Sequence, residues 1–230
     1  MANGRVWSFT VAVLLLGVRA IAGRGQDADT RLPFSCEVFS ARTSATALGS
    51  RFGSANVATD RVPWGGAEGD YNEGTVLFGG HPDARLEIYW RDTRSKRDPE
   101  WVSVRGKHTR WQSTAGITLG TPLRTVERLN GGPFRLLGFG SDVSGTVLGW
   151  SGGRLEAQNS NGCRVRLRLG IDWGSVDAKA AALINQVLGE REVSSGHPVM
   201  PQLNPTVYEL FLQYDRVPAN SRMHPTAATR

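Results

Sequence analysis

The sequence predicts an α+β protein. Two related units, each a helix followed by an antiparallel hairpin, are expected to pack on a sheet, with an added C-terminal helix and strand. Three observations lead to this prediction: runs in which apolar and polar residues alternate, helical patterns that end at glycine, and a short sequence that occurs twice. The chain has 230 residues, which is enough for one domain or two small ones with a buried core.

The first predicted unit covers residues 36–110. A short helix is expected at residues 44–52, where apolar residues recur at helical spacing, and Gly53 ends it. Two β-type runs at residues 75–78 and 85–90 are joined by a glycine-containing loop, which predicts a hairpin. The loop before this hairpin holds the acidic residues Glu68, Asp70 and Glu73. A solvated acidic loop is the favoured interpretation, with calcium binding by these carboxylates as the alternative.

The second predicted unit covers residues 111–171. Its helix has Leu123, Val126 and Leu129 or Asn130 on one face and ends at residues 131–133, Gly-Gly-Pro. A second hairpin is expected, with arms at residues 145–148 and 154–156 and a glycine-rich turn between them. Residues 163–169 then alternate strictly, which predicts a strand with its arginines facing solvent.

The two predicted hairpins share a sequence. Gly-Thr-Val-Leu is followed by Arg-Leu-Glu in both, beginning at Gly74 and Arg85 in the first and at Gly145 and Arg154 in the second. The difference in loop length is small and is tolerated by a hairpin. The repeat favours a tandem duplication; coincidence is the alternative, because Thr, Val and Leu are common in strands.

The C-terminal segment, residues 172–217, is expected to add one helix and one strand. The Ala-rich stretch at 176–188 follows Ser175, a good N-cap residue, and precedes Gly189. Residues 207–214 are expected to be a final strand, and residues 218–230 a disordered tail.

The N-terminus has the pattern of a secretory signal peptide over residues 1–22. Arg5 is followed by an apolar run of about 13 residues and by a small-x-small cleavage site that ends at Ala22. The run is too short to span a bilayer, since a membrane helix needs roughly 20 apolar residues; an uncleaved anchor is the alternative. We expect cleavage near Ala22, a flexible lead-in at residues 23–35, export to the periplasm or the exterior, and no transmembrane segment in the mature chain.

Two cysteines remain after cleavage, Cys36 and Cys163. Export places them where disulfides persist, so we expect a bridge between them, with two buried free thiols as the alternative. Two cysteines and four scattered histidines have no zinc-site spacing. No metal and no cofactor is therefore expected.

A basic stretch at residues 91–110 carries the whole charge excess of the mature chain. It holds seven Lys or Arg against three Asp or Glu, a net of +4, whereas the rest of the mature chain balances. An acidic envelope protein or an anionic envelope surface is the expected partner, and export argues against nucleic acid. A solvated linker between the units is the alternative. The candidate binding residues are Arg94, Lys96, Arg97, Arg105 and Lys107.

The hairpin loops hold three further candidates. Trp150 lies in a predicted turn and is the tryptophan most expected to be exposed, so it is a candidate interface anchor, as is His81 in the first hairpin loop. Local packing of the indole and an ordinary turn residue at His81 are the favoured interpretations. Ser151 fits a Gly-x-Ser-x-Gly nucleophile string, but that chemistry needs a strand before the serine and a helix after it. Because a hairpin arm is expected to follow, an ordinary turn is the favoured interpretation.

The second unit resembles a motif of small bacterial envelope proteins. The residues that carry the resemblance are Ile117, Gly120, Thr121, Val126, Leu129, Gly131 and Pro133. They look like the small lipoprotein of the outer-membrane β-barrel assembly machinery, and the tandem β-lactamase-inhibitory-protein-like domains are similar. The resemblance implies short helices packed on a small antiparallel sheet, and it implies fold more than activity. The first unit keeps only Leu48, Phe52 and Gly53, and no cysteine stands at the cleavage site for a lipid anchor.

The function expected from these observations is that of an exported, non-enzymatic binding or scaffold protein of the bacterial cell envelope. An exported hydrolase with an unrecognised site and a proteinaceous enzyme inhibitor are the alternatives.

Overall fold

The computed structural model describes residues 30–63, 71–160, 162–176 and 178–215. The predicted signal peptide and tail, most of the lead-in, and two of the candidate calcium ligands, Glu68 and Asp70, lie outside these residues. The described part from Arg31 onward belongs to one compact unit and contains both helices and sheets, which confirms the α+β class.

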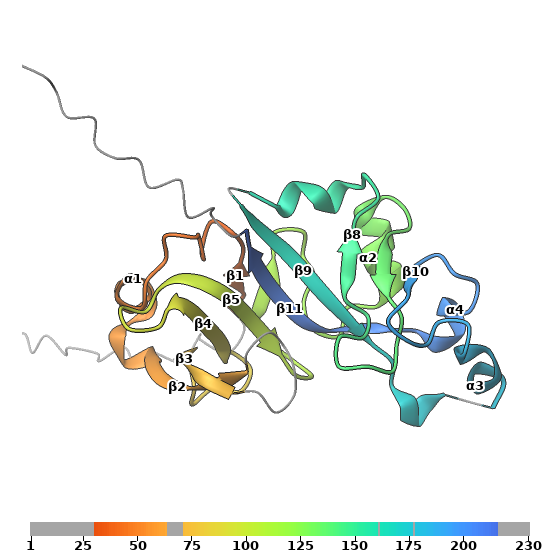
Figure 1. The fold of residues 1–230 in the computed structure, drawn as a ribbon, viewed down its shortest axis with the longest axis horizontal. Coiled ribbons are helices and arrows are strands. Elements are labelled where there is room, and N and C mark those ends of the chain that lie inside the picture. The colour runs from red at the N-terminus through yellow and green to blue at the C-terminus, as the bar shows by residue number, and fades with distance from the viewer. Residues whose placement is uncertain (1–29, 64–70, 161, 177, 216–230) are drawn as a thin grey trace, which may run out of the picture. The chain divides into compact units, whose positions relative to one another are not determined.

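Short helices alternate with strands along the described residues (Figure 1). The α-helices are α1 (Ala45–Phe52), α2 (Leu123–Asn130), α3 (Ala178–Ile184) and α4 (Met200–Leu203), and the 3-10 helices are η1 (Ser54–Asn56), η2 (Arg154–Gln158) and η3 (Trp173–Ser175). The strands are β1 (Leu32–Phe34), β2 (Val57–Pro63), β3 (Tyr71–Leu77), β4 (Leu86–Asp92), β5 (Arg97–Arg105), β6 (Trp111–Ser113), β7 (Arg135–Leu137), β8 (Val147–Gly149), β9 (Cys163–Gly170), β10 (Glu192–Ser194) and β11 (Thr206–Tyr214).

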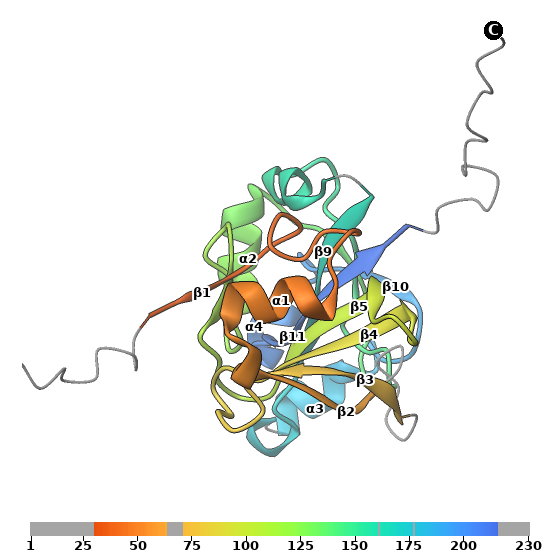
Figure 2. The ribbon, with the colours of Figure 1, turned by 90° about the vertical axis from the view of Figure 1, so that its left-hand side faces the viewer.

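A six-stranded antiparallel sheet organises the fold, in the order β2-β3-β4-β5-β11-β9. Strands β2 to β5 are neighbours in sequence and in space, and Figure 2 shows them beside α1. The last strand of the chain, β11, lies between β5 and β9 and pairs with both. The C-terminal strand therefore holds together parts of the sheet that come from distant stretches of sequence.

The two faces of this sheet differ in chemistry because side chains alternate along each strand. One cross-strand row on the first face consists of Ile88, Val102, Leu212 and Val165, and all four are buried. The neighbouring row on the opposite face consists of Glu87, Ser103, Phe211 and Arg166. The first face therefore packs into the core, whereas the second carries polar and charged side chains.

Two smaller sheets complete the strand pairing. Strands β10, β7 and β8 form a three-stranded antiparallel sheet, and β1 pairs with β6 in parallel. Because β1 begins at Leu32, residues 32–34 form a strand and are not part of the flexible lead-in that was expected up to residue 35. Phe34 of β1 is fully buried, and its apolar contacts hold this segment on the core.

The first predicted hairpin is confirmed. Strands β3 and β4 pair antiparallel with Thr75 opposite Ile88 and Leu77 opposite Leu86, and the connecting loop contains His81. The preceding helix is also confirmed: Ser44 caps α1 by accepting from the Ala47 N–H at 3.2 Å, and α1 ends at Gly53.

The second predicted hairpin is wrong in its second arm, because Arg154–Gln158 forms the 3-10 helix η2. Strand β8 instead pairs with β7. Side chains contributed by distant residues explain the difference. The Arg154 guanidinium donates to the carbonyls of Arg128 and Leu129 at the end of α2, and Asn130 Oδ1 accepts from the Leu155 N–H at 3.3 Å. These bonds tie the segment to a helix end, where carbonyls lack partners.

The other predicted elements are confirmed with changed limits. Helix α2 ends at Gly131, whose backbone is left-handed with φ 90°, and β9 and β11 lie where strands were expected. Helix α3 ends at Ile184 instead of residue 188, and Ser175, the expected N-cap residue, belongs to η3. The predicted basic linker is wrong as well: its middle part is β5, a central strand of the sheet, so the sheet takes strands from both sides of residue 110.

A disulfide joins Cys36 to Cys163 with a Cα–Cα distance of 5.7 Å, as expected. It closes a loop over 127 positions and fixes the segment before α1 to the start of β9. Among the described residues, none of the helices is long and apolar enough to cross a membrane.

Candidate functional site

The predicted basic surface is divided between the two ends of β5. Arg94 and Lys96 lie in the turn before this strand and Arg97 at its start, whereas Arg105 ends it and Lys107 follows. A nine-residue strand spans roughly 30 Å at about 3.3 Å per residue. The five candidates therefore do not form one patch. Lys96 is partly neutralised, since its Nζ lies 3.7 Å from Glu73 Oε1.

Trp150 is not an interface anchor on the surface, which corrects the prediction. Its side chain is fully buried and packs edge-on against Phe134, with ring centroids 5.3 Å apart. Its carbonyl accepts from Asn130 Nδ2 at 3.0 Å. The turn that follows is exposed, so the glycines around Trp150 indicated the turn correctly but not the direction of the indole.

Ser151 and His81 both lie on exposed turns. Ser151 has φ 53°, and the turn leads into η2 rather than into an α-helix. Within the described residues, no hydrogen bond joins Ser151 to a histidine. The arrangement that a nucleophile elbow requires is therefore not formed at Ser151.

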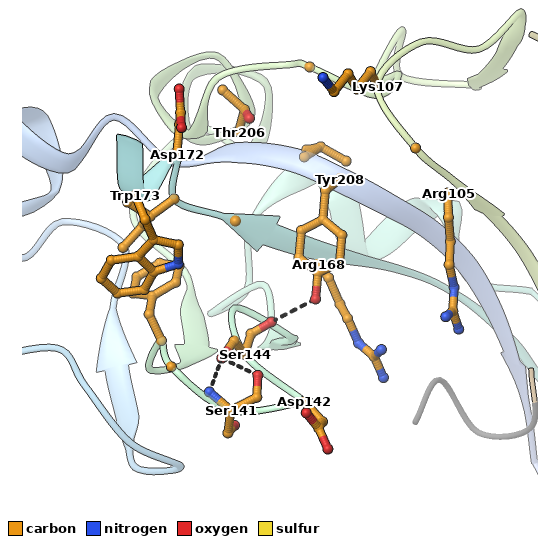
Figure 3. Close-up of a pocket in the computed structure, with 17 residues that line it drawn as sticks. Arg105, Lys107, Ser141, Asp142, Ser144, Arg168, Asp172, Trp173, Thr206 and Tyr208 are labelled. Carbon is orange, nitrogen blue, oxygen red and sulfur yellow. Dashed lines mark hydrogen bonds between the residues drawn. The ribbon is translucent and has the colours of Figure 1, made fainter. Parts of the chain in front are cut away.

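A cleft with a volume of about 880 Å³ lies where β5 and β9 end and β11 begins. Figure 3 shows its lining side chains. Of the predicted binding residues, Arg105 and Lys107 line this cleft, and the others do not. The further lining residues are Gly106, Gly120, Phe139, Gly140, Ser141, Asp142, Ser144, Arg168, Gly170, Ile171, Asp172, Trp173, Thr206, Val207 and Tyr208.

Three charged residues form a ladder beneath the cleft on the polar face of the sheet. Glu209 of β11 is opposite Arg105 of β5 on one side and Arg168 of β9 on the other. Arg105 Nε donates to Glu209 Oε1 at 2.9 Å, and Arg168 Nη1 lies 3.0 Å from Glu209 Oε2. Glu209 is fully buried. Burial raises the pKa of its carboxyl, and the charges of Arg105 and Arg168 oppose that rise.

Arg168 is held on every side. Its guanidinium lies over the rings of Phe211 and Trp101, with centroid distances of 5.3 and 5.8 Å, and these two rings stack on each other. Its Nε donates to Thr146 Oγ1 at 3.0 Å. Because only 5% of this side chain is exposed, Arg168 is a fixed part of the floor.

Arg105 is held less completely. A quarter of its side chain is exposed, and its Nη2 atom is buried without a hydrogen-bond partner among the described residues. Two guanidinium groups share the single carboxylate of Glu209. The unpaired Nη2 atom of Arg105 is itself out of reach of solvent, and the carboxylate of Glu209 is shared between two cations.

The Tyr208 side chain stands between the two sides of the cleft (Figure 3). Its hydroxyl donates to the Ser144 carbonyl at 3.4 Å, and Arg168 also hydrogen-bonds to it. Burial raises the pKa of this phenol. The neutral hydroxyl thus fixes the loop that carries Ser141 and Asp142 against the sheet.

One glycine is required for that loop to reach the sheet. Gly145 has φ 63°, and a Cβ atom there would lie 1.8 Å from the Leu169 carbonyl oxygen. The Leu169 N–H donates to the Gly145 carbonyl at 3.0 Å. A larger residue is excluded by both backbone conformation and close approach.

The rim opposite Arg105 carries an exposed tryptophan. Trp173 is 51% exposed, more than any other large hydrophobic side chain among the described residues. It lies in η3, whose first turn is fixed because Asp172 Oδ1 accepts from the Gly174 N–H at 3.1 Å. The sequence predicted exposure for Trp150 instead of Trp173, because a predicted turn was the signal for it and a turn does not fix the direction of an indole.

A second, smaller cleft of about 250 Å³ lies between α2 and the segment before α4 and includes Glu127, Ser195 and His197. Ser195 Oγ donates to Glu127 Oε1 at 2.6 Å and accepts from the Phe134 N–H at 2.8 Å. His197 Nδ1 accepts from the Val199 N–H. These bonds join backbone segments, so the hydroxyl of Ser195 has a structural role.

The described residues contain no group of three or more His, Cys, Asp or Glu side chains placed to hold a metal ion. Glu73, the described member of the acidic trio, pairs with Lys96 instead.

Comparison with protein-family models, with curated proteins and with solved structures finds no match to this chain.

Proposed function

We propose that this chain is an exported, non-enzymatic binding protein of the bacterial cell envelope and that it holds its ligand in the cleft above the Arg105–Glu209–Arg168 ladder. The observation that carries the proposal is the combination of a rigid floor with exposed groups at its edges. Arg168 and Tyr208 are fixed by several contacts, whereas Lys107 and Trp173 are exposed.

The fixed positions of Arg168 and Tyr208 favour binding, because these side chains do not have to be ordered when a ligand enters the cleft. Concave sites with a few fixed polar groups and an aromatic side chain are typical of ligand binding, and a prearranged site loses less entropy on association. The cleft volume of about 880 Å³ is in the range of small-molecule sites.

Export is supported by the disulfide between Cys36 and Cys163, because such bridges persist in oxidising compartments. The predicted signal peptide supports the same location. The basic residues predicted to bind an acidic partner lie on two separate surfaces, and the one with Arg105 and Lys107 borders this cleft.

The proposal is tested with the mature chain, residues 23–230, and the small-molecule fraction of an extract of its own cell envelope. We expect this fraction to raise the melting temperature of the wild-type protein and to have little effect on a Trp173→Ala/Lys107→Gln variant. A Lys179→Gln variant is the matched control, because Lys179 is an exposed lysine on α3 that does not line the cleft. An equal shift in all variants, or no shift in the wild type, contradicts the proposal.

A further inference from the structure

A short turn, Ser141–Ser144, forms part of the wall of the cleft and has a glycine at each end. Ser141, Asp142 and Ser144 line the cleft, and Figure 3 shows them beside Tyr208. Gly140 before the turn has φ 94°, and Gly145 after it has φ 63°. Glycine takes such angles without steric cost, and changes of backbone angle at the ends of a segment are what allow it to move as a unit.

The turn is held together by its own hydrogen bonds. The Ser144 N–H donates to the Ser141 carbonyl at 3.0 Å, and the Ser141 N–H donates to Ser144 Oγ at 2.5 Å. The Ser144 hydroxyl also donates to the Ser141 carbonyl (Figure 3). Because these bonds lie inside the turn, they are kept when the turn moves, so a movement is concentrated at the two glycines.

The turn is attached only weakly to the rest of the fold. Within the described part of the chain, one hydrogen bond joins it to a segment distant in sequence, from the Tyr208 hydroxyl to the Ser144 carbonyl at 3.4 Å. This distance is long for a hydroxyl donor, so the bond is weak. None of residues 141–144 is buried, whereas Phe139 and Gly145 on either side are buried. Segments with few buried contacts open locally at low free energy.

The position of the turn against the sheet also has a cost. Ser141 Oγ is buried and has no hydrogen-bond partner among the residues that the structure describes. A buried hydroxyl left unsatisfied costs more than one weak hydrogen bond contributes. Water reaches this hydroxyl when the turn moves outward. The closed and open positions are therefore close in free energy.

The two glycines differ in how firmly they are held. The Gly145 carbonyl accepts from the Leu169 N–H at 3.0 Å, and the Gly145 N–H donates to the Leu137 carbonyl at 3.1 Å. Gly140 is exposed, and a Cβ atom there would meet only the end of the Leu188 side chain, at 3.3 Å. Gly145 is therefore the fixed end of the turn, and Gly140 is the end that is free to swing.

We infer that the Ser141–Ser144 turn is a lid on the cleft, with Tyr208 as its latch. The lid opens when the Ser144 carbonyl leaves the Tyr208 hydroxyl. That hydroxyl is then free to donate to an acceptor group on a ligand, which takes the place of the Ser144 carbonyl. The role of the lid in ligand entry rests on the proposed binding function, whereas its movement does not.

The test measures cysteine accessibility in the mature chain without ligand. In Ser141→Cys, the thiol replaces a buried hydroxyl and reacts with dithiobis(nitrobenzoic acid) only when the lid is open. Asp142→Cys, exposed in the same turn, and Ser103→Cys, 2% exposed in β5, are the controls. We expect Ser141→Cys to react about tenfold more slowly than Asp142→Cys and about tenfold faster than Ser103→Cys. Cys36 and Cys163 are joined to each other, so they add no free thiol.

Tyr208→Phe tests the latch. Added to Ser141→Cys, it is expected to raise the labelling rate about threefold, because it removes the bond that holds the lid closed. The rates of Asp142→Cys and Ser103→Cys are expected to stay the same, which separates lid opening from general unfolding. Val143→Cys is a second reporter in the lid, in case the thiol at position 141 disturbs the fold, and the same response is expected.

Four results overturn the inference. Labelling of Ser141→Cys as slow as that of Ser103→Cys means that the turn does not open, and labelling as fast as that of Asp142→Cys means that it does not close. No response to Tyr208→Phe in either lid reporter excludes Tyr208 as the latch. An equal response in Ser103→Cys means that the whole sheet is loosened instead.

Failure of the lid and failure of the binding function give different results. If labelling follows the expected pattern but the envelope fraction stabilises no variant, the binding function is wrong and the lid remains a property of the fold. If the fraction stabilises the protein through Trp173 and Lys107 while labelling shows no lid, the binding function stands and the lid is wrong.

Discussion

Arg168 and Glu209 form a buried ion pair across β9 and β11, with Arg168 Nη1 3.0 Å from Glu209 Oε2 and side chains only 5% and 0% exposed. Taking both charges out of water is costly, and the pair is maintained because Arg105 adds a second cation on the other side of the carboxylate. The same ladder forms the floor of the proposed binding cleft, so stability and binding depend on it together.

Replacing Glu209 with Gln is expected to lower the free energy of unfolding by about 3–5 kcal/mol, because the Arg168 guanidinium stays buried without a countercharge. Urea unfolding at pH 8 measures the change. Glu192→Gln is the control, since Glu192 pairs with Arg135 in a bridge that is half exposed on both sides. That change is expected to cost less than about 1 kcal/mol. Equal costs for the two variants would contradict the structural role of the ladder.

Local patterns predicted several elements of this fold correctly. The helical spacing before Gly53 and Gly131 located α1 and α2, and strict alternation located β9. The hairpin of β3 and β4 followed from its loop, and the disulfide followed from the expected export. In each case the signal lies within a few residues, apart from the disulfide, which needed only two cysteines and an oxidising compartment.

The elements that could not be predicted depend on contacts between distant residues. The position of β11 between β5 and β9 follows from pairing with strands that are far apart in sequence. The η2 segment repeats the Arg-Leu-Glu that begins at Arg85, yet Arg154 binds the end of α2 and the chain forms a 3-10 helix. The alternation in β9 predicted that all its arginines face solvent, and this is wrong for Arg168. Its side chain is buried and pairs with Glu209.

Some of the charged residues of the site could be predicted from the sequence, but their pairing could not. Arg105 and Lys107 were candidates on charge alone, and the structure places both in the cleft. A charged Glu209 inside the apolar run of residues 207–212 was a usable signal, since a buried carboxylate must be paired. Its partners were not predictable, because they follow from the register of three strands.

Tyr214 links β11 to the segment before α1 and predicts a pH dependence. Its hydroxyl donates to the Phe39 carbonyl at 2.7 Å, and burial raises its pKa above the ordinary value of 10.0. A raised folded pKa means that the unfolded chain loses this proton first as pH increases. The stability from this group is therefore fully present below pH 10 and is lost as pH rises above 10.

The Tyr214→Phe variant tests this link. At pH 7 we expect it to lose about 1 kcal/mol, the net value of one hydrogen bond. Between pH 10 and 11.5 its stability should fall less steeply than that of the wild type, so the two curves converge. Chemical unfolding at a series of pH values measures both effects, and parallel curves would show that the Tyr214 phenol does not contribute.

Removing the bridge between Cys36 and Cys163 is expected to destabilise the protein through the unfolded state. A closed loop of 127 positions restricts the unfolded chain, which corresponds to roughly 5 kcal/mol in the loop-entropy model. The Cys36→Ser/Cys163→Ser variant should therefore unfold at lower urea concentration. Dithiothreitol should shift the wild type to the same midpoint and leave the variant unchanged. A midpoint in the variant equal to that of the oxidised wild type would show that the bridge adds no stability.

Gly145 predicts a direct connection between backbone geometry and ligand binding. In Gly145→Ala, the new methyl group would lie 1.8 Å from the Leu169 oxygen at a φ of 63°, so the loop with Ser141 and Asp142 must move away from β9. We expect a loss of more than about 2 kcal/mol in unfolding free energy, in the range of strained core changes, together with weaker binding in the cleft.

Gly80→Ala is the matched control, because nothing lies within 4 Å of a Cβ at Gly80 and its φ is not positive. The control is expected to change stability by less than about 1 kcal/mol and binding not at all. If Gly145→Ala destabilised the protein yet bound ligand as the wild type does, the loop would not belong to the binding site.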